Sequence, residues 1–552
     1  MDSVSLVPLG GLGEFGMNMM ALECGDDILV IDAGMAFPDA GMFGVDYVLP
    51  DLTWLVERRE NVRGVILTHG HEDHIGGLSN LLQHVDVPVY GVDLTLALAS
   101  HRLRENGMLA GAELHHIDAD SQLEFGSMSV EFIPVSHSIP GALAVVIHTP
   151  IGAILHTGDF KLDHTLKGDD GFDVGRFADL GSEGLLLLMS DSTNIEAPGL
   201  SPAEASIRPR LDQLFHQARR RLYVATFASS LYRVQQLIDL AVDHGRAVAV
   251  TGRSMVKNVQ VGTDLDYIWL PENHVVDIRD VRKMDPERVM VLMTGSQGEP
   301  FAALSLVSSD SHAHLRIEDG DTVALSARII PGHEKAIAGL VNNLYRRGAD
   351  VHYGPGAGIH ASGHGFREDL RMMLSLTRPR FFIPLHGEFR QLTLHARLAQ
   401  EMGVPTENVC VAENGQRVVL TEDSCSVEET VPAGRVLVDG RALDNLDEIV
   451  LNDRRQLSED GMVIITIVIH RDTGEVQGSP EMVSRGFIYM ADSTELVDET
   501  KQLAVDTVNR LSVKERLDQE TSQEAVRAAL RRFFSKRTDR KPIVLPVIIE
   551  VG

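Results

Sequence analysis

The sequence Thr68-His69-Gly70-His71-Glu72-Asp73-His74-Ile75-Gly76-Gly77 contains four potential metal ligands within six residues. It follows the apolar run 65–68, which predicts a buried strand that leads directly into the histidine-rich loop. Imidazole and carboxylate groups together suit Zn²⁺ or Mn²⁺. A single histidine is more often a capping or core residue than a ligand, but this density of ligands at a strand end predicts a metal site.

Further histidine and aspartate residues follow other predicted strands. These strand and residue pairs are 27–31 with Asp32, 130–135 with His137, 153–156 with Asp159, and 381–385 with His386. Functional side chains are often carried by loops at the ends of strands, because a rigid sheet positions them. Two metal ions need more ligands than the loop supplies, and a carboxylate such as that of Asp159 can bridge ions about 3.5–4 Å apart.

A different pattern occupies residues 205–355. Apolar strands are predicted at 221–225, 247–250, 289–293 and 322–325, and amphipathic helices at 232–243 and 334–347. This alternation is typical of a parallel α/β domain. Because the histidine-containing pattern resumes at His386, the simplest organisation is one domain interrupted by another.

The sequence therefore predicts five segments. A first domain covers 1–204 and continues at 356–450, the inserted domain covers 205–355, and 451–460 is a linker. Residues 461–552 form a small α+β module. Its predicted strands are 462–470, 486–489 and 543–550, and its predicted helices are 496–511 and 522–534.

Composition sets outer bounds on the class of protein. The chain has 552 residues, 44% of them hydrophobic and 23% charged, which excludes wholesale disorder. The net charge of −29 excludes a basic coat for nucleic acid, although metal ions and a local groove can still supply positive charge. No apolar run approaches the roughly 20 residues of a membrane span. With three cysteines and no secretory signal, we expect a cytoplasmic protein without membrane association.

Residues 68–77 resemble the signature loop of the metallo-β-lactamase superfamily, and Asp32, His137, Asp159 and His386 match the rest of its motif set in order. The inserted domain resembles the β-CASP arrangement of nucleic-acid-processing enzymes. The motifs that carry this resemblance are 190–194, 360–365 and 384–388. Residues 8–18, 225–230 and 457–461 are similar to the ribonuclease J family, and this similarity covers essentially the whole chain.

The resemblance implies an α/β fold: a metallo-β-lactamase αββα sandwich interrupted by a β-CASP α/β domain, with a small α+β C-terminal domain. It also implies a metal-dependent ribonuclease that acts in RNA maturation and decay. We expect a 5′-to-3′ exonuclease that prefers 5′-monophosphate ends and has additional endonuclease activity. The implied partners are single-stranded RNA, a second or further copies of the chain in a homodimer or homotetramer, and proteins of RNA decay.

Site roles follow from the same resemblance. One divalent ion, Zn²⁺ or Mn²⁺, is implied at His69, His71 and His137, a second at Asp73, His74 and His386, and Asp159 bridges them. Asp32 is expected to fix the loop without binding metal. His364 is the expected general acid, oriented by Asp191, and Asp73 also belongs to the catalytic set.

A phosphate pocket is expected at His360, Ala361, Ser362, Gly363 and His364, with Ser229 and Ser230 at a helix start opposite. Each of these serines could equally serve only as a helix cap. The candidates for local positive charge are Arg253, Arg328, Arg367 and Lys335, although solvation at the surface is the commoner role of each.

A third metal, Ca²⁺, is implied at Gly44, Asp46 and Asp439, where an oxygen-only ligand set would suit it. The alternative is that Asp439 is only a turn residue.

Three other functions stay open from the sequence. A small-molecule hydrolase of the metallo-β-lactamase fold would not explain the insertion. A different β-CASP endonuclease or DNA-repair nuclease shares the motifs but not the full-length resemblance. A scaffold subunit without activity would be expected to have lost one or more ligands, and all seven are intact.

Overall fold

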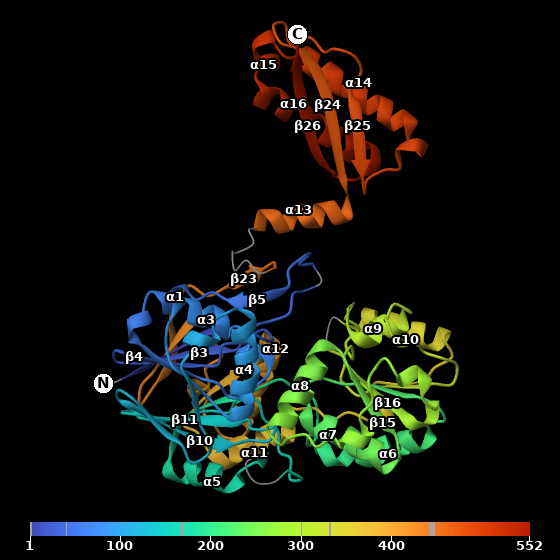
Figure 1. Ribbon diagram of the computed structural model, residues 1–552. Helices are drawn as coiled ribbons and strands as arrows, with labels where there is room; N and C mark the ends of the chain where they lie inside the picture. Colours follow the sequence, from blue (N-terminus) through green and yellow to red (C-terminus); the bar gives the residue numbers. More distant parts are fainter. Residues whose placement is uncertain (1–2, 40, 167–169, 300, 331–332, 441–447) are drawn as a thin grey trace. The chain divides into compact units, whose positions relative to one another are not determined.

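The computed structural model of the chain describes residues 3–39, 41–166, 170–299, 301–330, 333–440 and 448–552. These residues form two compact units (Figure 1). The first contains Met1–Phe37 and Tyr47–Val436, and the second contains Pro38–Asp46 and Leu437–Gly552. Each unit has hydrophobic clusters of its own.

Two mixed sheets form the framework of the first unit. In spatial order, the strands of the eight-stranded sheet are β22 (Cys425–Thr430), β21 (Gln416–Leu420), β1 (Val4–Gly10), β3 (Met19–Cys24), β4 (Asp27–Ile31), β6 (Val62–Ile66), β7 (Val89–Gly91) and β8 (Leu114–His116). Those of the six-stranded sheet are β19 (Phe381–Leu385), β13 (Leu185–Asp191), β12 (Gly152–His156), β11 (Leu143–Thr149), β10 (Met128–Pro134) and β9 (Gln122–Phe125).

The two sheets pack face to face between helices. One cluster of buried side chains draws Leu29 and Ile66 from the first sheet and Val145 and Leu187 from the second. The run Leu185–Asp191 is buried throughout, as expected for a strand covered on both faces. The outer faces pack against α3 (Leu78–His84) and α4 (Asp93–Glu105) on one side, and against α5 (Val174–Glu183), α11 (Arg367–Thr377) and α12 (Phe389–Glu401) on the other. The predicted αββα sandwich is confirmed.

The loops that carry the candidate site residues lie where strands end at one edge. Strands β12, β13 and β19 run parallel. Strand β10 runs in the same direction, because it is antiparallel to β11 and β11 is antiparallel to β12. The carboxyl ends of these four strands therefore meet, and they carry His137, Asp159, Asp191 and His386. In the other sheet β4 and β6 are also parallel, so Asp32 lies beside the histidine-rich loop.

The inserted domain, drawn in green and yellow in Figure 1, is built on a five-stranded parallel sheet. Helices α6, α7 and α8 pack against one face of this sheet, and α9 and α10 pack against the other. The four predicted strands and two predicted helices all form, with ends that differ by one residue at most. The elements are β15 (Ala247–Thr251), β16 (Val289–Met293), β14 (Leu222–Ala225), β17 (Thr322–Leu325), β18 (Asp350–His352), α6 (Arg208–Gln217), α7 (Leu231–Asp243), α8 (Arg253–Asp264), α9 (Ala303–Ser308) and α10 (Glu334–Arg346).

The second unit is a three-stranded sheet with helices on one face. Alternate residues of its central strand, such as Val463 and Ile465, pack against α14 and α16. The elements are α13 (Glu448–Glu459), β24 (Met462–His470), β25 (Glu481–Arg485), α14 (Thr494–Arg510), α15 (Val513–Leu517), α16 (Gln519–Thr538) and β26 (Ile543–Val551).

Two details of the second unit differ from the sequence prediction. The strand predicted at 486–489 is wrong, because the strand ends at Arg485 and Gly486 adopts a positive φ of 70°. A Cβ on Gly461 would lie only 2.3 Å from the carbonyl carbon of Gly486, so the two glycines make a tight corner there. Residues 451–460, predicted as a linker, lie largely within helix α13.

The other short strands and α-helices are β2 (Leu12–Gly13), β5 (Tyr47–Pro50), α1 (Thr53–Val56), α2 (Glu72–Ile75), β20 (Gly387–Glu388) and β23 (Arg435–Val438), and short 3-10 helices occur between the elements. Among the described residues, no helix is both long enough and apolar enough to cross a membrane.

Candidate metal centre and active site

Asp32 fastens the histidine-rich loop to the sheet. Its Oδ1 accepts a hydrogen bond from the backbone N–H of Thr68 at 2.8 Å, and its Oδ2 accepts one from the Thr68 hydroxyl at 2.9 Å. The same Oδ2 lies 2.7 Å from Nδ1 of His74. This contact fixes the ring so that Nε2 faces the site. Asp32 therefore holds the loop through Thr68 and His74, and its carboxylate is outside the described groups of possible metal ligands.

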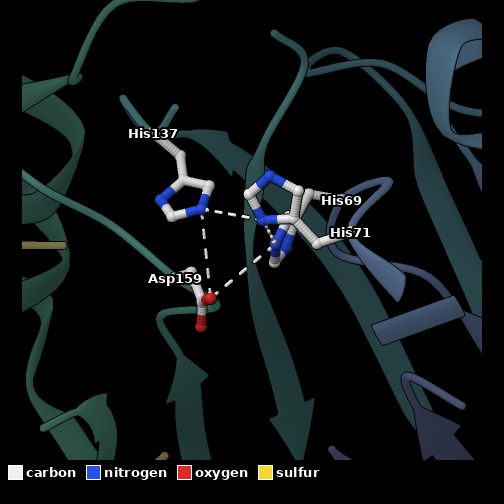
Figure 2. A group of neighbouring side chains, drawn as sticks. All are labelled: His69, His71, His137 and Asp159. Carbon is white, nitrogen blue, oxygen red and sulfur yellow. Dashed lines mark hydrogen bonds and ion pairs between the residues drawn. The ribbon is translucent and has the colours of Figure 1, made fainter. Parts of the chain in front are cut away.

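The first group of candidate ligands consists of His69, His71, His137 and Asp159 (Figure 2). Nδ1 of His71 lies 3.0 Å from Nε2 of His69 and 3.1 Å from Nε2 of His137. Oδ2 of Asp159 lies 3.7 Å and 4.0 Å from the same two Nε2 atoms. Three imidazole nitrogens and one carboxylate oxygen therefore converge on one point, as in a tetrahedral metal site.

The second group consists of Asp73, His74, Asp159 and His386. Nε2 of His386 lies 3.3 Å from Oδ2 of Asp73 and 3.8 Å from Oδ2 of Asp159. Nε2 of His74 lies 3.2 Å from the Asp159 oxygen. The structure thus brings together all seven sequence-predicted ligands, and Oδ2 of Asp159 is common to both groups.

The Asp159 carboxylate provides a test of whether a cation fits here. Oδ2 is buried, yet none of the described groups donates it a hydrogen bond. A buried charged oxygen without such a bond is costly unless a cation neutralises it. Burial raises the pKa of Asp159, but the surrounding His386 and His74 outweigh it and hold the pKa well below its ordinary value. The anionic form and the donor set both fit a pair of divalent cations.

The three histidines of the first group are in the form that binds metal. Burial, together with the neighbouring imidazoles, lowers the pKa of His69 and of His137 well below the ordinary value. Burial lowers the pKa of His71 to about 4 despite the nearby carboxylates of Asp73 and Asp159. At neutral pH these rings are therefore uncharged, with a lone pair available to a cation.

His364 and Asp191 form a hydrogen-bonded pair, and together with Asp159 and His386 they make a third group of possible ligands. Nδ1 of His364 lies 2.8 Å from Oδ2 of Asp191. The Asp191 side chain is 1% exposed and that of His364 is 20% exposed, so the ring is the part that reaches the open side of the site. Burial lowers the pKa of His364, but Asp191 and Asp159 more than compensate and raise it.

The predicted phosphate loop contacts the metal centre directly. The backbone oxygen of Gly363 accepts a hydrogen bond from Nδ1 of His137 at 2.7 Å. A Cβ on Gly363 would lie 2.7 Å from Cε1 of the same ring, so only glycine allows this approach. Nδ2 of Asn194 donates to the Ser362 hydroxyl at 2.8 Å and to the His364 backbone oxygen at 3.2 Å. The loop is therefore held from both sides.

Arg233, in the first turn of α7, ties the inserted domain to this loop. The side chain is 1% exposed, and it forms a two-bond ion pair with Glu204 at 2.5 and 2.9 Å. Its Nη atoms also donate to the backbone oxygens of Ile359 and Ala361, at 3.2 and 3.3 Å. The start of α7, which carries Ser229 and Ser230, is thus fixed against the predicted phosphate loop.

The helix-cap alternative for the two serines is not what the structure shows. Ser230 is the N-cap residue of α7, but its side chain makes no capping hydrogen bond. Among the described residues neither Ser229 nor Ser230 has a side-chain hydrogen bond, so both hydroxyls are available to a ligand.

Sequence reasoning missed several residues that hold the site. Nδ2 of Asn18 lies 3.1 Å from Nε2 of His74, and the Thr193 hydroxyl lies 2.6 Å from Nδ1 of His386. Asn18, Thr193 and Asn194 lie in stretches already noted for their resemblance, which was the available signal. Arg233 gave no signal, because the amphipathic pattern of α7 marks only its apolar face.

The proposed calcium residues have other partners. Oδ2 of Asp439 lies 2.5 Å from Nη2 of Arg454, and Oδ2 of Asp46 accepts a hydrogen bond from the Gly440 backbone at 2.8 Å. The Arg454 guanidinium thus supplies at Asp439 the positive charge that Ca²⁺ would bring. Gly44 contributes no side chain, and a Cβ there would lie 2.6 Å from Nη1 of Arg454.

Four family models match the chain. They are the metallo-beta-lactamase superfamily at 12–191, the ribonuclease J beta-CASP domain at 219–344, the Zn-dependent metallo-hydrolase RNA specificity domain at 357–409, and the ribonuclease J C-terminal domain at 449–551. Together with the His and Asp groups, these matches define the class: a metal-dependent hydrolase of the metallo-β-lactamase fold with an inserted β-CASP domain. The site binds divalent metal.

Curated relatives give the family. Ribonuclease J 1 of Streptococcus pyogenes is 38% identical, over 99% of this chain and 98% of the relative. Ribonuclease J of Synechocystis is 41% identical over 99% and 86%, and ribonuclease J of Thermus thermophilus is 39% identical over 100% and 96%. The chain belongs to the ribonuclease J family, and it is a metal-dependent nuclease that acts on RNA.

A solved structure illustrates the shared fold. It is a protein of unknown function from Enterococcus faecalis, which is 18% identical with a TM-score of 0.54, over 76% of this chain and 100% of that one. At that identity the likeness extends to the fold alone.

The close approach of Gly363 to His137 generates a prediction. In Gly363→Ala the new methyl group displaces the His137 ring, so metal affinity and RNA cleavage should each fall about 10- to 100-fold, as for other residues that orient metal ligands. Metal content measured by atomic emission and cleavage rates should change together. Gly356→Ala is the matched control, because a Cβ at Gly356 meets no atom within 4 Å. Equal behaviour of the two variants would show that this contact does not position His137.

Proposed function

We propose that this chain is a 5′-to-3′ exoribonuclease that prefers 5′-monophosphate ends, with additional endonuclease activity. The observation that carries the proposal is the contact between the phosphate loop and the metal centre, where the Gly363 backbone meets His137 at 2.7 Å. A phosphate held at the Ser362–His364 turn would lie a short distance from the phosphate at the metals. That spacing favours cleavage of the first linkage from an end.

In this proposal His69, His71 and His137 would hold one divalent ion, Asp73, His74 and His386 would hold the other, and both would share Asp159. Zn²⁺ and Mn²⁺ both suit this set of ligands. Bound ions of this kind supply an acidified water for in-line attack on phosphorus and positive charge for the phosphate oxygens. The shared, unsatisfied oxygen of Asp159 supports the bridging role.

The chain's own residues would do the rest of the chemistry. His364 would donate a proton to the departing 3′ oxygen, and Asp191 would orient its ring through the 2.8 Å contact at Nδ1. This arrangement leaves Nε2 of His364 as the donor to the substrate. No serine or cysteine nucleophile is required, since water is the attacking group.

The terminal phosphate would bind between the 360–364 loop and the start of α7. The donors there would be the Ser362, Ser229 and Ser230 hydroxyls and the backbone N–H groups of the turn. A turn of this kind suits an anion. A pocket that closes around one phosphate excludes a 5′-triphosphate end. Cleavage inside an RNA chain does not require the terminal phosphate to be bound.

We further propose that copies of the chain associate through the second unit. The face of its sheet opposite α14 and α16 is apolar and half-exposed. Leu545 is 41% exposed, Val547 39%, Ile549 44% and Val483 44%. Four large apolar side chains on one flat sheet face form a patch that a second copy of the same face can cover. The expected assembly is a homodimer or homotetramer, working in RNA decay with other proteins in the cytoplasm.

The metal proposal predicts about two transition-metal ions per purified chain. His74→Ala should abolish RNA cleavage, because it removes one ligand and the group held by Asp32, while far-UV circular dichroism stays unchanged. His115→Ala is the control, since its partly exposed ring contacts Glu113 away from the centre. Undiminished cleavage by His74→Ala after exhaustive chelation would refute the metal mechanism.

The terminal-phosphate proposal predicts that Ser362→Ala lowers mononucleotide release from 5′-monophosphate RNA by about 10- to 100-fold, the worth of one hydrogen bond to a charged group. Internal cleavage of the same RNA should change little. The assay compares 5′-labelled RNA that carries monophosphate or triphosphate, with Ser311→Ala as an exposed-serine control. Equal rates on both ends by the intact enzyme would exclude the pocket.

The association proposal predicts that Val547→Lys shifts the protein towards monomer in light scattering, because a charge on an apolar interface must be desolvated. Lys536→Gln also changes the charge by one unit, in the opposite direction, on α16, which covers the other face of the sheet. It should leave the particle mass as in the wild type. An unchanged mass for Val547→Lys would show that this face is not the interface.

A further inference from the structure

Arg328 lies at the edge of the inserted sheet where ligands of parallel α/β folds bind. It follows β17, and the neighbouring strand β14 ends just before the Ser229–Ser230 turn. The helix after β14 packs on one face of the sheet, whereas the helices after β16 and β17 pack on the other. Open sheets bind ligands outside the carboxyl ends of strands where this change of side occurs.

The position of Arg328 is fixed by two buried side chains. Its backbone oxygen accepts a hydrogen bond from Nε2 of Gln297 at 2.8 Å, and Oε1 of Gln297 accepts one from the Ile330 backbone at 2.9 Å. Nη1 of Arg328 donates a hydrogen bond to Oδ1 of Asn194. Gln297 and Asn194 are 2% and 3% exposed, so the anchors are rigid while the arginine itself is exposed.

Asn194 connects this arginine to the phosphate loop. Its amide nitrogen donates to the Ser362 hydroxyl at 2.8 Å and to the His364 backbone oxygen at 3.2 Å. One asparagine thus accepts from the guanidinium and donates to the loop. The remaining N–H groups of the guanidinium make no hydrogen bond with any other described residue.

No described carboxylate neutralises the charge of Arg328, in contrast to two buried cations near the loop. Arg233 is paired with Glu204 at 2.5 Å, and Lys161 is paired with Asp163 at 3.0 Å. No carboxylate of the described residues forms an ion pair with Arg328. Burial, followed by Arg233, Arg328 and Lys161, lowers the pKa of His360 to about 3, which is consistent with a positive potential at the loop.

We propose that Arg328 is a specificity-determining residue that binds the terminal phosphate of the RNA beside Ser362. This inference rests on the 5′-end preference proposed above. A terminal phosphate carries about −1.5 to −2 charges at neutral pH, whereas a 5′-hydroxyl end carries none. The planar guanidinium offers two parallel N–H donors to such a group, and Asn194 holds it in place for that contact.

The test compares the wild type with Arg328→Gln, using RNA of one sequence that carries either a 5′-monophosphate or a 5′-hydroxyl. The substitution should lower kcat/KM on the monophosphate RNA by about 10- to 100-fold, mainly through KM. On the hydroxyl RNA the change should be about threefold or less. Arg328→Lys should keep part of the preference for the monophosphate RNA, because lysine retains the positive charge but lacks the two parallel N–H donors of the guanidinium. The dissociation constant of a short 5′-phosphorylated oligonucleotide, measured with EDTA present, should be lowest for the wild type, higher for Arg328→Lys and highest for Arg328→Gln.

Arg346→Gln is the matched control. This exposed arginine also donates to an asparagine Oδ1, that of Asn343, at 2.9 Å. It ends α10, which returns from β17 to the start of β18, so it lies at the opposite edge of the same sheet. Arg346→Gln should cleave the monophosphate RNA and the hydroxyl RNA at the wild-type rates.

The outcomes separate the two proposals. A wild type that cleaves both RNAs at equal rates would refute the 5′-end preference itself. A wild type that prefers the monophosphate, with Arg328→Gln keeping that preference in full, would refute only the role of Arg328. Equal losses on both RNAs would also overturn this role, because they would indicate general RNA binding.

Discussion

The buried carboxylate of Asp159 is the constraint on which the site depends. Its Oδ2 lies within 4.0 Å of histidine nitrogens from two groups, and none of the described residues donates it a hydrogen bond. An anion in that position needs cations close by. The sandwich meets this need by bringing the carboxyl ends of β6, β10, β12 and β19 to one edge, so that residues far apart in sequence form two adjoining ligand groups.

The inserted domain is coupled to that edge by a second buried charge. Arg233 is paired with Glu204 and also bonds the backbone of the 359–361 segment. A buried ion pair of this kind is weak support for stability, but loss of one partner leaves a costly unpaired charge. Its evident effect is positional, because it sets the start of α7 against the loop that touches His137. Asn194 holds the same loop from the other side, through Ser362 and His364.

An acidic nuclease must concentrate its affinity for RNA. At a net charge of −29, the surface as a whole repels phosphate, so binding has to occur where cations and N–H donors converge. The described residues provide two such places, the metal centre and the loop beside Arg328. Two buried cations near the loop, Arg233 and Lys161, are paired with carboxylates, whereas Arg328 has no ion pair among the described residues.

The sequence by itself indicated the inserted parallel domain and the clustering of the seven candidate ligands, because each ligand follows a strand and strand ends share an edge. The αββα sandwich was implied by the resemblance to the metallo-β-lactamase superfamily. Tertiary structure alone decided how the ligands are held. The roles of Asn18, Thr193 and Arg233 depend on contacts with residues distant in sequence, which no local pattern encodes. The false strand at 486–489 has the same origin: its apolar residues favour a strand, but packing of Gly461 against Gly486 demands a corner there.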